Sequence, residues 1–317
     1  MSRPFFTVLV TTYDRAQIVR RCVDSCLGQT FSDYEVVVVD DGSTDDTFSI
    51  LERIDDPRLR VVAHESNRGI DPSRHTGVAN SRGEWIVHID SDDELFPYTL
   101  ERLREFIDAL PDGVRVLRTR LLWDDGRITP AFVPTGPIDY EGRLRAWEAD
   151  RSDAGNCWHR SVFDLNPYFR DRRGAMEALR ELNMSRVETT MYVPDVLAKV
   201  HTDAPNSWAR GADASEVIPR LLREAPDMLW MMETTIDEHG AALAQHAPRT
   251  YRLFLRGAST QAFLLGDRRK GFRYGLAALR LGRLDALAWG TLALGLLGPW
   301  AVVRGTVAHR RLNRLRP

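Results

Sequence analysis

A regular alternation of short apolar runs and helical segments over residues 1–110 constrains the fold more than any other feature of this chain. The apolar runs are rich in β-branched residues, are bounded by Asp, Gly, Asn or Ser, and cover residues 6–11, 34–39, 59–63 and 85–89. Segments with helical spacing follow them at 18–27, 47–54, 73–79 and 98–110. This order predicts an α/β fold with a doubly wound sheet of buried, parallel strands. Its ligand site is expected at the carboxyl ends of those strands.

The alternation weakens beyond residue 110. Residues 114–122 and 191–200 indicate two further strands, the second interrupted by Pro194, and residues 124–126 indicate a hairpin turn. Residues 216–280 have the apolar spacing of helices. The expected organisation is a mixed-sheet domain over 1–215, made of halves 1–110 and 111–215, and a helical C-terminal region over 216–317.

Composition places the chain among ordinary globular proteins, with 43% apolar and 28% charged residues. It excludes a disordered chain and a disulfide scaffold. Cys22 and Cys26 lie one helical turn apart in an apolar-periodic segment, and Cys157 is far away, so we expect buried thiols and no zinc site. Residues 1–4 lead into the first strand without the pattern of a secretory signal, so we expect a cytoplasmic protein.

The formal net charge of -2 conceals a strongly basic C-terminal region. Residues 251–317 contain 13 Arg or Lys and two acids, Asp267 and Asp285, which gives 13 - 2 = +11 and leaves -13 for the rest of the chain. The basic residues border a long apolar block instead of alternating with single aromatic residues. This pattern favours an anionic membrane surface as the partner and disfavours nucleic acid.

The apolar block at residues 286–303 contains no charged residue. As a helix its 18 residues would reach about 27 Å, against a hydrocarbon core of about 30 Å. Pro299 weakens a span further, whereas basic flanks on both sides, Trp289 and Trp300 suit a segment in the membrane interface. We expect a protein peripheral on the inner face of the cell membrane, with a single span and a buried core hairpin as alternatives.

Polar clusters follow each of the first four strands, at 11–15, 40–44, 67–69 with Arg74 a turn later, and 90–94. By the strand-end rule they should converge on one crevice. Residues 40–46 taken alone could be a turn and a helix cap. The acidic run at 90–93 is harder to explain in that way, because two carboxylates about 4 Å apart repel by about 4 kcal/mol at an effective dielectric of 20. Oxygen-only ligands of this kind favour Mg²⁺ or Mn²⁺.

The usual phosphate-binding signatures are missing. The first strand is not followed by G-x-G-x-x-G, and the sequence contains no G-x-x-x-x-G-K-[ST], which disfavours dinucleotide dehydrogenases and P-loop enzymes. A phosphate would then be met by a metal ion and by arginine.

Four ordered segments resemble the inverting family 2 glycosyltransferases with the GT-A fold: TVLVTTYDR (7–15), QTFSDYEVVVVDDGSTDDT (29–47), NRGI with Arg74 following, and GEWIVHIDSDDE (83–94). The resemblance implies a nucleotide-sugar donor, with a UDP-sugar favoured, and an acceptor-side half at 111–215. The implied donor-binding residues are Thr11, Tyr13, Arg15, Asp40, Asp41, Arg74 and Asp90. The implied ligands of Mn²⁺ or Mg²⁺ are Asp92, which completes a D-x-D pair with Asp90, together with Asp93 and His201.

Glycosyl transfer also needs a carboxylate that takes the proton of the acceptor hydroxyl. Similar enzymes often carry an adjacent acidic pair on a helix, and the corresponding residues 166–182 lack it. Glu177 and Glu181 lie one turn apart there, and we select Glu177 as the base. The alternative is a solvated helix face on which Arg173 and Arg180 pair with these acids.

Two classes of function follow. The first is a metal-dependent transferase that moves a sugar to a hydroxyl of a glycan or lipid-linked acceptor, in the synthesis of cell-envelope or extracellular polysaccharide or glycolipid. The second is a catalytically inactive nucleotide-sugar-binding or scaffold protein that has lost the base. A nucleotidyltransferase is disfavoured, because residues 11–15 lack a glycine-rich loop.

Overall fold

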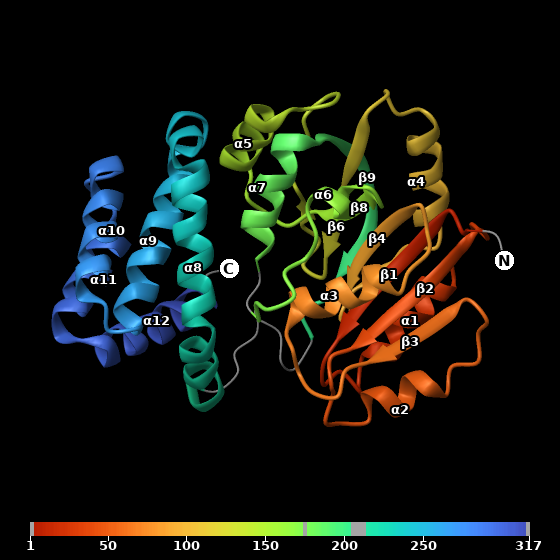
Figure 1. Ribbon diagram of the computed structural model, residues 1–317, viewed down its shortest axis with the longest axis horizontal. Coiled ribbons are helices and arrows are strands. Elements are labelled where there is room, and N and C mark those ends of the chain that lie inside the picture. Colours follow the sequence, from red (N-terminus) through yellow and green to blue (C-terminus); the bar gives the residue numbers. More distant parts are fainter. Residues whose placement is uncertain (1–2, 174–175, 204–213, 315–317) are drawn as a thin grey trace. The chain divides into compact units, whose positions relative to one another are not determined.

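The computed structural model describes residues 3–173, 176–203 and 214–314 of the chain. The chain forms two compact units (Figure 1). The first comprises Met1–Arg173 and Arg180–Arg210, and the second comprises Gly174–Leu179 and Gly211–Pro317. The first unit holds the sheet, and the second is helical.

The four strands predicted from the first 110 residues form one parallel group. They are β1 (Phe6–Thr12), β2 (Tyr34–Asp40), β3 (Leu59–Ala63) and β4 (Trp85–Asp90), in the order β3-β2-β1-β4. The predicted parallel arrangement is therefore confirmed. The predicted burial is confirmed for β1 and β2 and for most of β4, but it is wrong for β3, which is only partly buried because it has a neighbour on one side only.

The later strands extend this same sheet and make it mixed. These strands are β5 (Glu94–Leu95), β6 (Val114–Trp123), β7 (Ile128–Thr129), β8 (Gly155–His159) and β9 (Thr189–Val200). The order continues β4-β8-β6-β9-β5, in which only β9 lies parallel to its partner β6. The predicted hairpin turn at residues 124–126 joins β6 to β7. Pro194 does not interrupt β9, and the register with β6 shifts near it instead.

The helices of the first unit are α1 (Val19–Leu27), α2 (Thr47–Glu52), α3 (Ile70–Ala79), α4 (Thr99–Asp108), α5 (Tyr140–Ala149), α6 (Val162–Leu165) and the part of α7 (Glu177–Val187) from Arg180 onward. Several of them bury apolar residues in the cores beside the sheet, such as Val23 of α1 and Phe163 of α6. Helix α1 buries Cys22 and Cys26 in the main core beside strand residues such as Val8 and Val36. Cys22 and Cys26 are buried free thiols, as predicted, and Cys157 is a buried free thiol as well.

The second unit contains five helices among its described residues: α8 (Ala214–His246), α9 (Pro248–Leu264), α10 (Arg268–Leu281), α11 (Ala286–Leu297) and α12 (Pro299–Arg314). Small residues such as Ala258 and Ala262 let the helices approach closely around Phe263. The uncharged block at 286–303 breaks at Gly298, whose φ of 100° ends α11 before Pro299 begins α12. Within the described part of the chain, no helix is long and apolar enough to cross a membrane.

A buried carboxylate joins three strands of the parallel group. Glu35 on β2 accepts hydrogen bonds from Thr7 Oγ1 at 2.9 Å, from Arg82 Nε at 2.9 Å and from the backbone N–H of Arg82 and Gly83, just before β4. Burial opposes its ionisation, yet these donors hold the pKa of Glu35 below its ordinary value. A charge-assisted network of this kind fixes the spacing of β1, β2 and β4 at their amino ends.

We predict that Glu35→Gln destabilises the protein by about 2 kcal/mol at neutral pH, because the amide turns a donor toward Arg82 and leaves a charge unpaired. Because the pKa of Glu35 is lower in the folded protein, ionised Glu35 stabilises the fold fully when the pH is above its ordinary pKa. This stabilisation is lost as the pH falls through the pKa of the folded protein. Urea unfolding at neutral pH measures the effect. Asp108→Asn, which breaks the exposed Arg104–Asp108 pair, is the control and should change stability by less than about 0.5 kcal/mol. Equal effects of the two variants would contradict the assignment.

Candidate active site

Three carboxylates gather on the acidic loop between β4 and β5. Asp90, Asp92 and Asp93 each offer an oxygen, and these oxygens lie within 4.8 Å of one another. A tight turn produces the cluster, since Asp93 N donates to Asp90 O at 3.0 Å. The Asp90 side chain is exposed, whereas Asp92 is mostly covered. A set of oxygen ligands from one short loop suits a hard divalent cation.

The electrostatics of this loop are strained without a cation. Burial raises the pKa of Asp93 to about 9, and the neighbouring Asp90 and Asp92 add to the shift. Asp93 is therefore protonated at neutral pH when no cation is present. A bound divalent cation would displace that proton and offset the repulsion.

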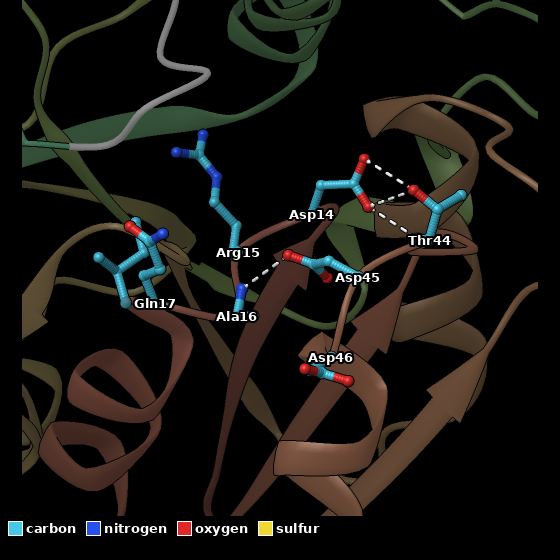
Figure 2. A pocket seen from close by; sticks show the side chains of 8 residues that line it. Asp14, Arg15, Ala16, Gln17, Thr44, Asp45 and Asp46 are labelled. Atoms are coloured by element: carbon cyan, nitrogen blue, oxygen red, sulfur yellow. Dashed lines mark hydrogen bonds between the residues drawn. The ribbon is translucent and has the colours of Figure 1, made fainter.

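A cavity of about 460 Å³ opens at the ends of β1 and β2 (Figure 2). Asp14, in the left-handed region with φ 50°, accepts from Thr44 N at 2.7 Å, and Asp45 accepts from Ala16 N at 3.0 Å. These bonds fix both rims of the cavity. Arg15 points away from the two carboxylates, and its Nη2 lies 3.7 Å from Asp92 Oδ2. The cavity and the acidic loop are thus linked by one guanidinium.

The two aspartates after β2 have different surroundings. Asp40 is buried and accepts from Ser43, and burial raises its pKa more than these hydrogen bonds lower it. The Asp41 carboxylate accepts from Arg68 N at 2.9 Å and Gly69 N at 2.7 Å, and it lies 2.7 Å from His64 Nδ1. Asp41 therefore fixes the loop before α3. The contact of Asp41 with a nucleotide-sugar donor stays a prediction, and the carboxylate oxygens of Asp41 already have protein partners.

The other residues predicted to bind the nucleotide-sugar donor lie at the same edge of the sheet. Thr11 pairs with Asp90 in the register of β1 and β4, and Thr12 pairs with Asp40 in the register of β1 and β2. Arg74 reaches over from α3, and its Nη2 lies 3.3 Å from Asp90 Oδ1. Tyr13 is half-buried at the end of β1. The structure thus brings the strand-end clusters together as the strand-end rule requires.

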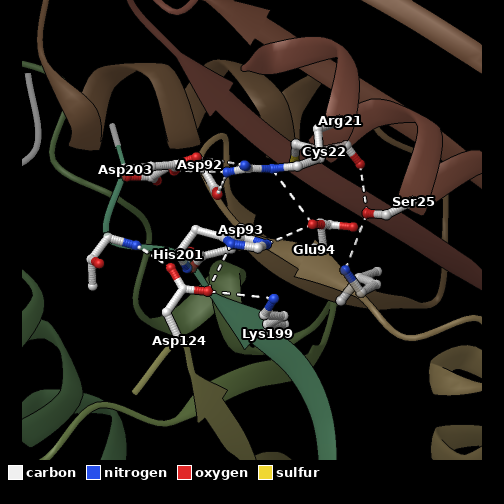
Figure 3. A network of polar contacts seen from close by, with 12 residues as sticks. Arg21, Cys22, Ser25, Asp92, Asp93, Glu94, Asp124, Lys199, His201 and Asp203 are labelled. Carbon is white, nitrogen blue, oxygen red and sulfur yellow. Dashed lines mark hydrogen bonds and ion pairs between the residues drawn. The ribbon is translucent and has the colours of Figure 1, made fainter. Parts of the chain in front are cut away.

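His201 lies against the acidic loop but outside its carboxylate cluster (Figure 3). Its backbone N–H donates to Asp93 Oδ1 at 3.1 Å. Its Nε2 lies 2.5 Å from Glu94 Oε1, and its Nδ1 lies 3.0 Å from Asp124 Oδ1. Both ring nitrogens therefore face carboxylates, and a role as metal ligand, which stays a prediction, requires one of these contacts to open.

Arg21 on α1 is a site residue that the sequence analysis missed. It pairs with Asp203 through Nη1 at 2.7 Å and Nη2 at 3.0 Å, and Nη2 also donates to the backbone oxygen of Asp92 at 2.8 Å. Its Nε lies 3.5 Å from Glu94. Arg21 thus ties the acidic loop to the segment after β9. The pairing of β5 with β9 and the packing of α1 against β5 bring these residues together, and no local sequence pattern reports either.

Comparison with known proteins gives the family. Residues 7–164 match Glycosyl transferase family 2. The chain belongs to that family. It is 39% identical over 129 residues to the succinoglycan biosynthesis protein ExoO of Rhizobium meliloti (strain 1021), covering 41% of this chain and 37% of ExoO. The chain therefore spans well under half of that relative.

Two solved structures share the fold of the family. The S. aureus TarS fragment 1–349, in complex with UDP-GlcNAc, superposes with a TM-score of 0.64 at 19% identity, covering 96% of this chain and 92% of that one. The mannosyltransferase PcManGT from Pyrobaculum calidifontis, with GDP-Man and Mn²⁺, gives a TM-score of 0.53 at 18% identity, covering 96% and 88%. The predicted GT-A fold is confirmed.

The two candidate bases of this family 2 domain differ in their environment. Glu181 lies 2.5 Å from Arg118 Nη2 and 2.8 Å from Arg143 Nη2. Burial opposes its ionisation, but the two guanidinium groups hold the pKa of Glu181 below its ordinary value, which makes it a weak base. Glu177 is exposed on the first turn of α7, in the segment assigned to the second unit.

The alternative of a solvated helix face is wrong for Arg180. This residue is fully buried, and its guanidinium lies over the rings of Tyr168 at 3.8 Å and Trp158 at 4.5 Å. Burial lowers its pKa. Arg180 is therefore a packing residue of the first unit, stabilised by aromatic faces.

We predict that Asp93→Asn removes a pH dependence from the cation-free family 2 domain. Asn keeps the acceptor for His201 N–H but cannot ionise. The parent binds one more proton when folded than when unfolded between the ordinary pKa of 3.8 and about 9, so its stability falls as the pH rises through that window. Melting temperatures measured in EDTA from about pH 5.5 to about pH 9 should show Asp93→Asn gaining steadily on the parent.

Asp108→Asn is again the control, and its difference from the parent should stay flat with pH. A difference between Asp93→Asn and the parent that does not change over the same range would contradict the raised pKa.

Proposed function

We propose that the chain is a metal-dependent inverting glycosyltransferase that moves a sugar from a nucleoside-diphosphate sugar to a hydroxyl group. The observation that carries the proposal is the convergence of Asp90, Asp92 and Asp93 with two arginines at the carboxyl ends of the parallel strands. The bound UDP-GlcNAc of the TarS structure and the GDP-Man and Mn²⁺ of PcManGT support a donor of this class. We favour a UDP-sugar.

The carboxylate set fits Mn²⁺ or Mg²⁺, because all its donors are oxygens, and burial together with the neighbouring Asp90 and Asp92 raises the pKa of Asp93. Asp92 would hold the ion, with Asp90 and Asp93 beside it. When bound, the ion would neutralise the charge that develops on the leaving diphosphate. The proposed donor contacts are Thr11, Tyr13, Arg15, Asp40, Asp41, Arg74 and Asp90.

Arg15 and Arg74 are the proposed contacts of the phosphates. Both reach the acidic loop, and Arg15 Nη1 is buried with no hydrogen-bond partner in the described part of the chain. A buried N–H of this kind is costly unless a ligand atom accepts from it. A phosphate oxygen is an acceptor of the right charge.

Glu177 is the proposed base for the acceptor hydroxyl. Its competitor Glu181 is held by two arginines. The relation to a succinoglycan biosynthesis protein supports an acceptor among glycans or lipid-linked glycans of the cell envelope. We further propose that the basic region 251–317 attaches the protein to the inner, anionic face of the cell membrane. A scaffold protein that binds nucleotide sugars without turnover is the alternative.

We predict that Asp92→Ala loses metal-dependent transfer from a panel of nucleotide sugars by at least about 100-fold. Glu177→Gln should lose transfer by a similar factor while keeping its affinity for donor and Mn²⁺, because it alters only proton removal. Glu52→Gln, at the exposed end of α2, is the matched control and should be unaffected. Full activity of Glu177→Gln would remove it as the base, and a parent that binds nucleotide tightly without any turnover would favour the scaffold.

We predict that Asp203→Asn and Arg21→Gln each weaken Mn²⁺ binding by about tenfold, although neither side chain belongs to the carboxylate cluster. Each change breaks the Arg21–Asp203 pair, which holds the Arg21 guanidinium on the backbone oxygen of Asp92. Titration followed by electron paramagnetic resonance of free Mn²⁺ gives the dissociation constants. Arg20→Gln breaks only an exposed pair with Asp24 on the same helix and is the matched control. Parent-like Mn²⁺ binding in both variants would show that the Arg21–Asp203 pair does not order the acidic loop.

A further inference from the structure

Helix α11 carries an apolar face that is exposed to solvent. The helix has no charged residue, and one face buries Ala288, Leu292 and Gly295 against its own unit. A neighbouring face repeats at spacings of three and four residues and contains Ala286, Trp289, Ala293, Leu296 and Leu297, all of them exposed. We call this set the α11 face. The solvent side of a surface helix is normally polar, so such a face indicates a partner.

The exposure of the α11 face is built into the fold. Asp285 caps the helix by accepting from Leu287 N at 3.1 Å and Ala288 N at 3.0 Å, and it pairs with Arg252 at 3.3 Å and Arg256 at 3.4 Å. These contacts tie the start of α11 to α9. The loop held in this way presents Leu284 with a side chain that is 98% exposed.

Aromatic residues lie at both ends of the exposed stretch. Trp289 Nε1 donates to Arg283 O at 2.9 Å, which orients the indole along the loop before α11. Leu297 is 78% exposed at the end of α11, and Trp300 is 67% exposed in the first turn of α12. Indole groups with one polar and one apolar edge are typical of the boundary between lipid headgroups and acyl chains.

The charges around the α11 face are positive. Arg283 is exposed before the helix, and Arg268 donates through Nη2 to Leu296 O at 3.2 Å at its end. Arg304 is exposed on the helix that follows. The nearest acid, Asp285, is buried by its two arginine partners. An apolar face with guanidinium groups at both ends is complementary to a surface that has an apolar interior and anionic groups on its outside.

We propose that the α11 face lies in the interface of an anionic lipid bilayer, with the axis of α11 parallel to the membrane plane. The proposal rests on the membrane attachment proposed above and names the surface that makes it. With 12 residues α11 is about 18 Å long and cannot cross a hydrocarbon core of about 30 Å. Lying flat, it buries Leu296 and Leu297 below the headgroups while Arg268 and Arg283 reach lipid phosphates.

A second copy of the chain fits this face less well. If two copies packed face to face with antiparallel helices, Arg283 of one would approach Arg268 of the other, and parallel packing would place identical arginines together. No exposed acid of α11 or of the loop before it offsets that repulsion. Self-association is therefore an outcome for the test to detect.

Flotation of the full chain with vesicles tests the proposal. The parent should float with phosphatidylcholine vesicles that contain about 30% phosphatidylglycerol and much less with phosphatidylcholine alone. Replacing Leu296 and Leu297 together by Gln should reduce the bound fraction at least about tenfold. Replacing Leu165 and Val187, two exposed apolar residues of the first unit, by Gln is the matched control and should leave flotation unchanged.

Arg268→Gln with Arg283→Gln provides a second variant that leaves the apolar face intact. It should weaken binding to the anionic vesicles by about fivefold for each arginine and remove most of the dependence on phosphatidylglycerol. Equal flotation of the parent and the Leu296/Leu297 variant would overturn the proposal. A dimer of the parent in sedimentation experiments that dissociates only in the Leu296/Leu297 variant would overturn it as well. Flotation is measured without nucleotide or metal, so a chain that floats but transfers no sugar would leave this inference standing and remove only the transferase proposal.

Discussion

Repulsion among three carboxylates on one short turn is the constraint around which the first unit is organised. The turn between β4 and β5 cannot separate Asp90, Asp92 and Asp93, and burial of Asp93 sharpens the conflict. Guanidinium groups from elsewhere in the chain reduce it: Arg15 faces Asp92 and Arg74 faces Asp90. The pKa of Asp93 nevertheless stays raised to about 9, first by burial and then by the neighbouring Asp90 and Asp92. The proposed divalent cation would bind there, where a sheet of this type receives its ligand.

The topology of the sheet decides what surrounds this cluster. Because β5 begins directly after the acidic loop and pairs with the end of β9, the residues after β9 come to lie beside the loop. His201 then bonds Asp93 through its backbone, and Asp203 meets Arg21. Contacts that join α1, β5 and β9 make the geometry of the loop depend on the whole unit.

The parts of this arrangement that follow from local patterns could be predicted from sequence. β-Branched runs and their polar ends predicted the parallel strands and the edge at which the clusters meet, and helical spacing predicted the buried thiols of Cys22 and Cys26. Partners set by long-range pairing could not be predicted. The two arginines that hold Glu181 come from β6 and α5, far from it in sequence. Arg180 is buried against aromatic rings such as that of Tyr168, and no spacing in the sequence indicates this contact. The edge position of β3 likewise follows from strand order, which its own residues do not encode.

We propose that the acidic loop binds a divalent ion, which in turn binds the diphosphate of a nucleotide. A crystal structure of the protein with Mn²⁺ and UDP, with manganese located by its anomalous scattering, tests it most directly. We expect one strong manganese peak within coordination distance of Asp92 and of the diphosphate oxygens, with the nucleoside at the ends of β1 and β2. Manganese or nucleotide bound elsewhere, with the loop between β4 and β5 empty, would contradict it.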